Sequence, residues 1–147
     1  DTAGSRAFTA AWGDRVQVVG DDLLVTSPDR VRRGVAEHWC NAALIKVNQV
    51  GTVSEARAAC AEARAAGWGT LVSARSGDTE DLSIVHLATG WDAGQIKVGS
   101  FARSERTAKW NELLRIEEAL GAGAHYAGWS ALPRTVQAGR REAPAGS

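Results

Sequence analysis

The sequence predicts an α/β protein in which short strands alternate with longer helices. Four short apolar runs recur along the chain, and each is followed by a longer stretch with helical periodicity. Residues that start or stop helices stand between these stretches. Repeated strand–helix units require a parallel sheet with right-handed crossovers. Four such strands form either a small open α/β sheet or half of an eight-stranded barrel, and periodicity does not separate the two.

The first strand–helix unit runs from Val16 to Trp39. Its strand, residues 16–19, is a β-branched run that ends in a loop opened by Gly20. Ser27 then supplies a helix N-cap and is followed by a proline at the first helical position. We therefore expect a helix from there to about Trp39.

The second unit starts with an apolar strand over residues 42–47. Thr52 and Glu55 have the spacing of a capping box, in which each side chain binds the other's main-chain N–H. The alanine-rich stretch after them predicts a helix to Ala66, and Gly67 provides the stop.

The third and fourth units complete the domain. Their predicted strands cover residues 69–73 and 95–98. A helix is expected from about 78 to 89, and a strongly periodic one over 103–120. Residues 1–131 therefore form one domain. The tail over 132–147 is rich in Gly, Ala, Pro and Arg and is expected to be disordered.

Composition excludes several classes of protein. The chain has 147 residues, 17 basic and 17 acidic side chains, and a net charge of zero, which disfavours partners such as nucleic acid or an anionic membrane. No apolar run approaches the ~20 residues of a membrane span. Cys40 and Cys60 predict buried reduced thiols in a cytoplasmic protein. Because the chain contains no methionine and begins with Asp1, we expect its natural start to lie upstream.

Polar and charged side chains lie at the carboxyl end of every predicted strand, where functional residues of α/β proteins gather. They are Asp21 and Asp22 after the first strand, Lys46 in the second, Arg75 and Ser76 after the third, and Lys97 in the fourth. Paired acids at such a place are also common as loop residues or helix caps. A lysine within an apolar strand is harder to explain structurally, because burying an unpaired ammonium is unfavourable.

These residue types favour one kind of chemistry. Two lysines held together in a dry pocket suit proton abstraction. Arg75 and Ser76 suit recognition of a phosphate or carboxylate, the first through paired donors and the second through its hydroxyl. The pattern predicts removal of a proton next to a carboxylate on an anionic substrate, with Lys46, Lys97 and Arg75 in one shared pocket.

Four stretches of the chain, in order, resemble sequence signatures of the enolase family. They are LIKVNQVGT at 44–52, SARSGDTED at 73–81, GQIK at 94–97, and RSER with LLRIEE at 103–106 and 113–118. The resemblance extends from about Arg6 to Trp129. It implies the C-terminal half of an enolase-type TIM barrel, namely its strands five to eight.

The resemblance also implies roles for the residues at the strand ends. Asp21 matches the third carboxylate ligand of the family's magnesium ion, and Lys46 matches the base that removes the alpha proton. Arg75 and Ser76 match a phosphate-binding pair, with Ser76 near a second metal. Lys97 matches a lysine that contacts the substrate carboxylate and the first metal. In the family, two Mg²⁺ ions stabilise the enolate that forms.

Two departures from the family pattern matter. Ala74 stands where the family has a histidine of the substrate site. In the family, several parts of the site lie before the position that corresponds to Asp1. They are the other metal-binding carboxylates, the catalytic glutamates and the N-terminal domain. One aspartate cannot hold Mg²⁺ in near-octahedral geometry, so we expect Mg²⁺ as a cofactor only if a partner supplies further carboxylates.

Three hypotheses follow for function. The first is an enolase-like lyase (dehydratase) acting on 2-phosphoglycerate or another phosphorylated or carboxylated hydroxy acid, completed by a second copy or by a separate N-terminal half. The second is a non-catalytic anion-binding or assembly module derived from enolase. The third is a fragment of a full-length enolase. Retention of Lys46 and Lys97 favours an enzyme, whereas Ala74 and the missing ligands favour a module.

Overall fold

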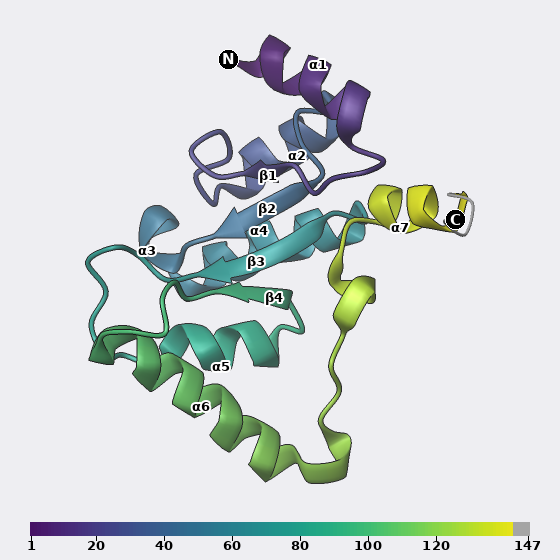
Figure 1. Ribbon diagram of the computed structural model, residues 1–147. Helices are drawn as coiled ribbons and strands as arrows, with labels where there is room; N and C mark the ends of the chain where they lie inside the picture. Colours follow the sequence, from purple (N-terminus) through teal and green to yellow (C-terminus); the bar gives the residue numbers. More distant parts are fainter. Residues whose placement is uncertain (143–147) are drawn as a thin grey trace.

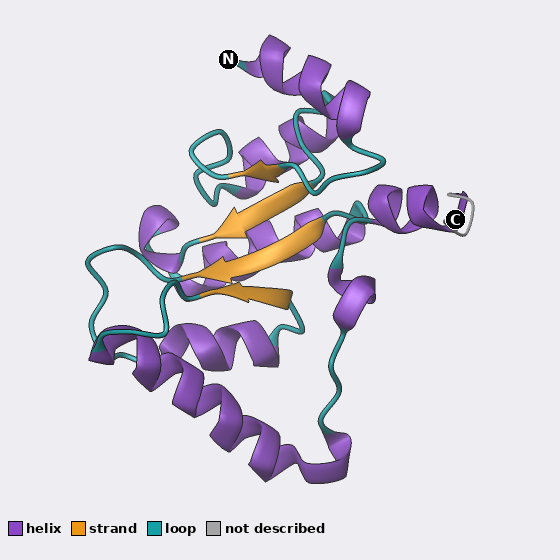
Figure 2. Cartoon of the chain, viewed as in Figure 1, coloured by secondary structure: helices purple, strands orange, loops and turns teal. Residues whose placement is uncertain are grey.

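A four-stranded parallel sheet forms the centre of the computed structural model, which describes residues 1–142 (Figures 1 and 2). The strands lie side by side in chain order and are β1 (Val19–Gly20), β2 (Ala42–Ile45), β3 (Gly69–Ser73) and β4 (Gly94–Lys97). A helical connection follows each of the first three strands, and a long helix follows the fourth. The prediction of four successive βα units is therefore confirmed.

One face of the sheet packs against three of these helices. They are α2 (Pro28–Ala36), α4 (Val53–Ala65) and α5 (Ser83–Gly90). Alternate strand residues, including Ala43, Ile45 and Val72, join their buried side chains in one core. Small residues such as Ala59 on α4 let that helix lie close to the sheet.

The opposite face of the sheet is only partly covered. Leu71 and Gln95 are half-buried there, and Lys97 is exposed. Gln17, just before β1, and Gln95 on β4 exchange two side-chain hydrogen bonds of 2.9 and 2.8 Å. This bridge joins the first and last strands over Gly69, where an added side chain would collide with Gln17. Helices on one face and an incompletely covered opposite face are consistent with half of a barrel wall.

Both helix N-caps expected at Ser27 and Thr52 are confirmed, since their side chains accept from Arg30 N–H and Glu55 N–H. Other boundaries differ. Strand β1 is shorter than the predicted 16–19, and α2 ends before Trp39.

The helix expected from about 78 begins only at Ser83. Asp78 instead accepts a hydrogen bond of 3.3 Å from Arg75 N–H, which holds the segment after β3 as a loop. Asp81 Oδ1 accepts from Ser83 N–H at 2.8 Å and thereby starts α5. Local hydrogen bonds from the main chain to aspartate side chains therefore compete with the helix at its expected start.

Several elements were not predicted. They are α1 (Thr2–Trp12), α3 (Val47–Val50), and two 3₁₀ turns, η1 (Gly121–Gly123) and η2 (Gly128–Ala131), after the long helix α6 (Ser104–Leu120). Among residues 1–142, no helix combines the length and apolar character needed to cross a bilayer.

The prediction of disorder over 132–147 is wrong for the part of the tail that the structure describes. Residues Arg134–Glu142 form helix α7. Arg134 N–H donates to Gly67 O at 2.9 Å, and Val136 is 3% exposed. The tail thus packs back against the turn before β3, and its polar composition conceals these anchors. Residues 143–147 lie outside the described part of the chain.

The two cysteines are free and buried, as expected. Burial raises the pKa of the Cys40 thiol to about 12 and also raises the pKa of Cys60. Since the thiolate is the reactive form, a disulfide reagent at pH 8 should label neither thiol in the folded protein and both in urea. Rapid labelling of two thiols per chain without denaturant would contradict this placement.

We expect the chain to associate through its sheet edges. Strands β1 and β4 are the outermost strands, and Val19 on β1 is 39% exposed. Unpaired edges and an incompletely covered face favour pairing with another chain. Light scattering at micromolar concentration should give a mass above the 15.5 kDa of one chain. A compact monomer would rule out this association.

Candidate functional site

The carboxyl ends of the strands meet at one edge of the sheet, because all neighbouring strands are parallel. In the sheet, Ser73 on β3 pairs with Lys97 on β4. The residue before it on β3, Val72, pairs with Ile45 on β2. Lys46 therefore directly follows β2 at the level of Ser73. With strands about 4.8 Å apart, Lys46 and Lys97 are separated by one strand.

Lys46 forms an ion pair at this edge. Its side chain is only 11% exposed, and Nζ donates to Asp21 Oδ1 at 2.5 Å. The loop after β1 also holds the main chain here, since Lys46 N–H donates to the hydroxyl of buried Thr26 at 3.0 Å. That hydroxyl in turn donates to Gln49 Oε1 at 2.8 Å. The ends of β1 and β2 are thus joined by both charge and hydrogen bonds.

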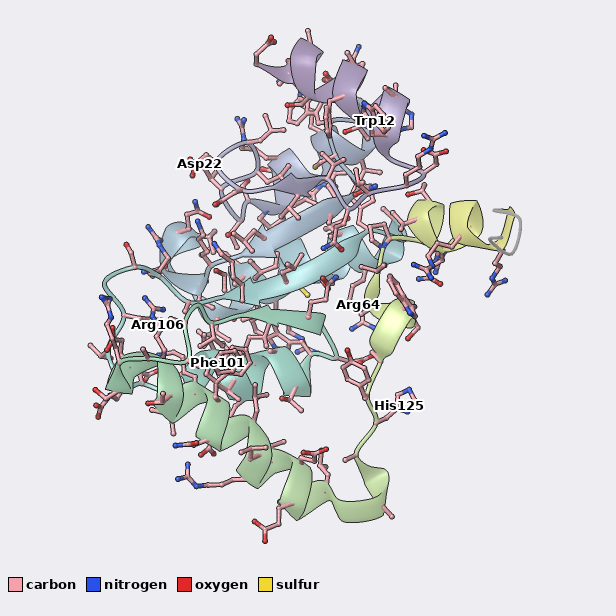
Figure 3. The ribbon with its side chains drawn as sticks, viewed as in Figure 1. Trp12, Asp22, Arg64, Phe101, Arg106 and His125 are labelled. Atoms are coloured by element: carbon pink, nitrogen blue, oxygen red, sulfur yellow. The ribbon has the colours of Figure 1, made fainter. Side chains whose placement is uncertain are left out.

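The two acidic residues after β1 differ in their surroundings. Asp21 is half-buried and forms an ion pair with Lys46. Asp22, labelled in Figure 3, is exposed. Of the two carboxylates, only that of Asp21 forms an ion pair with Lys46.

Arg75 and Ser76 lie in the loop after β3. Arg75 Nη1 donates to Asn48 Oδ1 on α3 at 2.8 Å, which joins the ends of β2 and β3. Ser76 is exposed. Ala74, where the family has histidine, is 8% exposed, and its N–H donates to Lys97 O at 2.9 Å.

The shared pocket expected for Lys46, Lys97 and Arg75 is not enclosed by the described residues alone. Three clefts of about 210, 350 and 360 Å³ are lined by other residues. The Lys97 side chain is exposed on the incompletely covered face of the sheet. That these three cations share one pocket stays a prediction, since it depends on what covers this face.

Magnesium does not fit the residues present. In the described range 1–142, no group of three or more His, Cys, Asp or Glu side chains is arranged to hold a metal. Mg²⁺ requires near-octahedral oxygen coordination, and Asp21 offers one carboxylate that already binds Lys46.

We expect calorimetric titration of this chain alone with Mg²⁺ to show weak or undetectable binding. Asp21→Asn should leave that result unchanged, because the single carboxylate adds little. A tight, stoichiometric site would mean that another copy supplies further carboxylates.

Two buried cations at this edge, Arg106 and Lys109 on α6, were not predicted. Arg106 is 8% exposed and Lys109 is fully buried. The sequence does contain a sign of their burial. Arg106 and Lys109 are three residues apart and lie on the same helical stripe as the apolar Trp110 and Leu113. A cation on the buried stripe of a helix indicates a specific buried partner.

Known proteins with similar sequences belong to one family. The family described as "Enolase, C-terminal TIM barrel domain" matches residues 1–135. An enolase of Solanum lycopersicum is 57% identical over 123 residues, which cover 84% of this chain and 28% of that protein. The matched part of the chain thus spans less than a third of the length of this relative. A parallel βα half barrel, the strand-end residues and these matches together place the chain in the enolase family.

Proposed function

We propose that this chain supplies the proton-abstracting and anion-binding part of an enolase-like carbon–oxygen lyase. The substrate class is a phosphorylated or carboxylated hydroxy acid, such as 2-phosphoglycerate or an analogue from a specialised pathway. The observation that supports this most is Lys46. It ends β2 nearly buried, level with Lys97 across one strand, at the edge where α/β proteins bind ligands.

In this proposal Lys46 accepts the proton alpha to the substrate carboxylate. In the structure its side-chain nitrogen donates to Asp21 Oδ1. A nitrogen engaged by Asp21 in this way is not free to accept a proton from a substrate. The role therefore requires that Asp21 be drawn to another cation when substrate is bound.

The anion would be held by the other strand-end residues. Arg75 uses one of its five N–H donors on Asn48 and has further donors for a phosphate. The exposed Ser76 hydroxyl and Lys97 ammonium add a donor and a charge on neighbouring strands. Arginine and serine together would hold phosphate, and Lys97 would hold carboxylate.

Completion must come from outside this chain. The remaining carboxylates would be supplied by a second copy or by a separate N-terminal enolase half, with Asp21 as one metal ligand among them. Mg²⁺ bound in such a completed site would stabilise the charge of the enolate.

The test is dehydration of 2-phosphoglycerate, followed by the absorbance of the enol product. This chain alone should show no turnover with Mg²⁺. Mixed or co-expressed with the N-terminal part of an enolase, it should turn the substrate over. A folded, stoichiometric complex that acts neither on 2-phosphoglycerate nor on carboxylated hydroxy acids would contradict the lyase.

The alternative is a non-catalytic anion-binding or assembly module. Ala74 in place of the family's histidine and the Asp21–Lys46 ion pair favour it. A module would bind inorganic phosphate yet never exchange a substrate proton with solvent, whereas a lyase would do both.

A further inference from the structure

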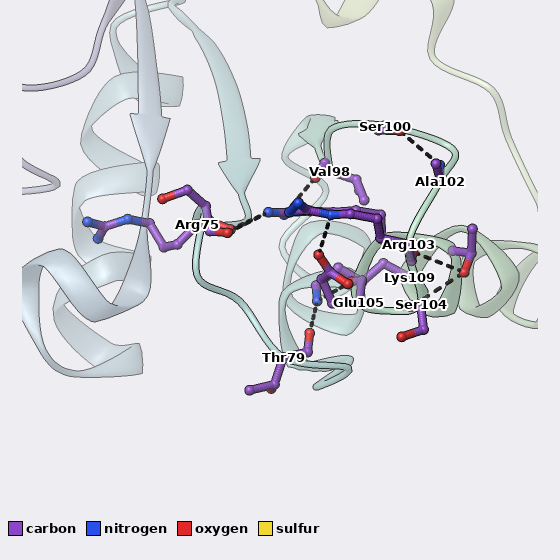
Figure 4. A network of polar contacts seen from close by, with 12 residues as sticks. Arg75, Thr79, Val98, Ser100, Ala102, Arg103, Ser104, Glu105 and Lys109 are labelled. Atoms are coloured by element: carbon purple, nitrogen blue, oxygen red, sulfur yellow. Dashed lines mark hydrogen bonds and ion pairs between the residues drawn. The ribbon is translucent and has the colours of Figure 1, made fainter.

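Arg106 on α6 connects the loops after β3 and β4. Figure 4 shows Arg75 and Val98, which carry two of its acceptors, together with Lys109. Its guanidinium donates to Val98 O at 2.9 Å, to Arg75 O at 2.7 Å and to Ser76 O at 3.2 Å. Val98 directly follows Lys97. The buried Arg106 side chain thus binds main-chain carbonyls of Arg75 and Ser76, the expected phosphate-binding pair. It also binds the carbonyl of the residue that follows Lys97.

Lys109, one helical turn further along α6, holds the same loop at a second point. Its ammonium donates to Thr79 O at 2.7 Å and to Glu105 O at 3.0 Å, and it lies 3.6 Å from Asp78 Oδ2. Asp78 accepts from Arg75 N–H, so it connects this second anchor with the first. The loop from 75 to 79 is therefore attached to α6 near both of its ends.

Two buried cations would be strongly unfavourable unless their donors were used. Here main-chain carbonyls supply the acceptors. They include those of Arg75 and Thr79 in the loop after β3 and that of Val98, directly after Lys97. Gly99 has φ +109, a conformation that favours glycine, and it lies where the chain turns past the Arg106 side chain. The glycine at position 99 thus permits the turn that carries the chain past Arg106.

We propose that Arg106 and Lys109 are positioning residues that set the geometry of the anion site formed by Arg75, Ser76 and Lys97. The inference rests on the proposed function, because it gives these two cations a role in binding the substrate's anionic groups. Arg106 fixes the distance between the β3 and β4 loops, and Lys109 fixes the path of the β3 loop. Neither touches the ligand.

A purely structural role makes a different prediction. If the two cations only hold α6 against the sheet, their replacement would lower stability and leave the affinity of the folded protein for anions unchanged. A positioning role lowers affinity in protein that remains folded, because donors displaced by about 1 Å lose their alignment with the ligand.

The experiment compares wild type, Arg106→Lys, Lys109→Met and the control Arg115→Gln. Arg106→Lys keeps the charge but cannot bind three carbonyls at once, and Lys109→Met keeps the side-chain stem without the ammonium. Arg115 lies on the same helix, and its exposed side chain pairs with Glu112. Inorganic phosphate is titrated into each 147-residue chain while amide signals of Arg75 and Ser76 are followed by NMR. Amide hydrogen exchange of residues 75–80 and thermal unfolding are measured in parallel.

In both site variants, we expect phosphate affinity to fall at least about tenfold and the loop amides to exchange at least about tenfold faster. Arg115→Gln should match wild type in both measurements. Loss of thermal stability with unchanged phosphate affinity, or unchanged exchange of the loop, would overturn the positioning role. If Arg106→Lys does not fold, Lys109→Met decides the question in the same way.

Wild-type protein that does not bind phosphate at Arg75 and Ser76 would contradict the anion site of the proposed function itself. Wild-type protein that binds phosphate, together with variants that bind it equally well, would overturn only the role of Arg106 and Lys109.

Discussion

Lys46→Ala should abolish dehydration by the completed enzyme, with a loss of at least about 1,000-fold in rate, which lies within the usual range for a general base. Lys46 is nearly buried at the end of β2, and it is the group proposed above as the proton acceptor. Alanine fits the end of an apolar strand, so circular dichroism and association should be unchanged. The measurement is turnover of 2-phosphoglycerate by the chain together with its N-terminal complement.

Companion variants separate the base from the anion-binding residues. Lys46→Arg should fail as completely as alanine, because a guanidinium stays protonated and cannot accept a proton. Lys97→Ala should mainly raise KM, since it removes a charge that binds the substrate. Arg57→Ala, at an exposed position on α4, is the control and should behave as wild type. Turnover by Lys46→Ala at the wild-type rate would assign the base to another residue.

Trp39→Ala should lower the free energy of unfolding by about 3–5 kcal/mol, the usual effect of removing a large buried aromatic side chain. Trp39 is 1% exposed, and its indole N–H donates to Glu37 Oε2 at 3.0 Å. The Arg33 guanidinium lies 5.3 Å from its ring centroid. Small domains have only about 5–15 kcal/mol in total, so this loss is a large part of the stability of the chain.

Urea unfolding followed by circular dichroism measures this effect. The matched control is Trp129→Ala, because that ring is 62% exposed and contacts Arg140 at the surface. It should change stability by less than about 1 kcal/mol. Equal effects of the two substitutions would mean that Trp39 does not anchor the core behind β2.

Local signals predicted the main elements of the fold well. Ser27 and Thr52 cap their helices as expected, because N-cap hydrogen bonds join residues three apart and depend little on the rest of the fold. Helix α7 was missed for the opposite reason. Its anchors, such as the bond from Arg134 to Gly67, join residues far apart in the sequence, and composition alone does not show them.

The candidate site was predictable where it depends on strand periodicity. The apolar runs of the sequence place Lys46 and Lys97 at the carboxyl ends of their strands. Parallel pairing then brings those two ends to the same edge of the sheet. The Asp21–Lys46 ion pair and the attachment of the β3 loop to Arg106 could not be predicted, since they depend on the path of loops in three dimensions. Buried cations with main-chain partners leave only a weak trace in a helical pattern.

The most direct test is exchange of the substrate's alpha proton with solvent deuterium, because it reports abstraction even when the later elimination is blocked. Proton NMR of 2-phosphoglycerate in D₂O follows the loss of that signal in the presence of the completed protein. The wild-type chain should catalyse exchange, and Lys46→Ala should not, although it binds phosphate normally. Exchange by Lys46→Ala at the wild-type rate, or no exchange of any candidate hydroxy acid by the wild-type complex, would contradict the assignment of Lys46 as the base.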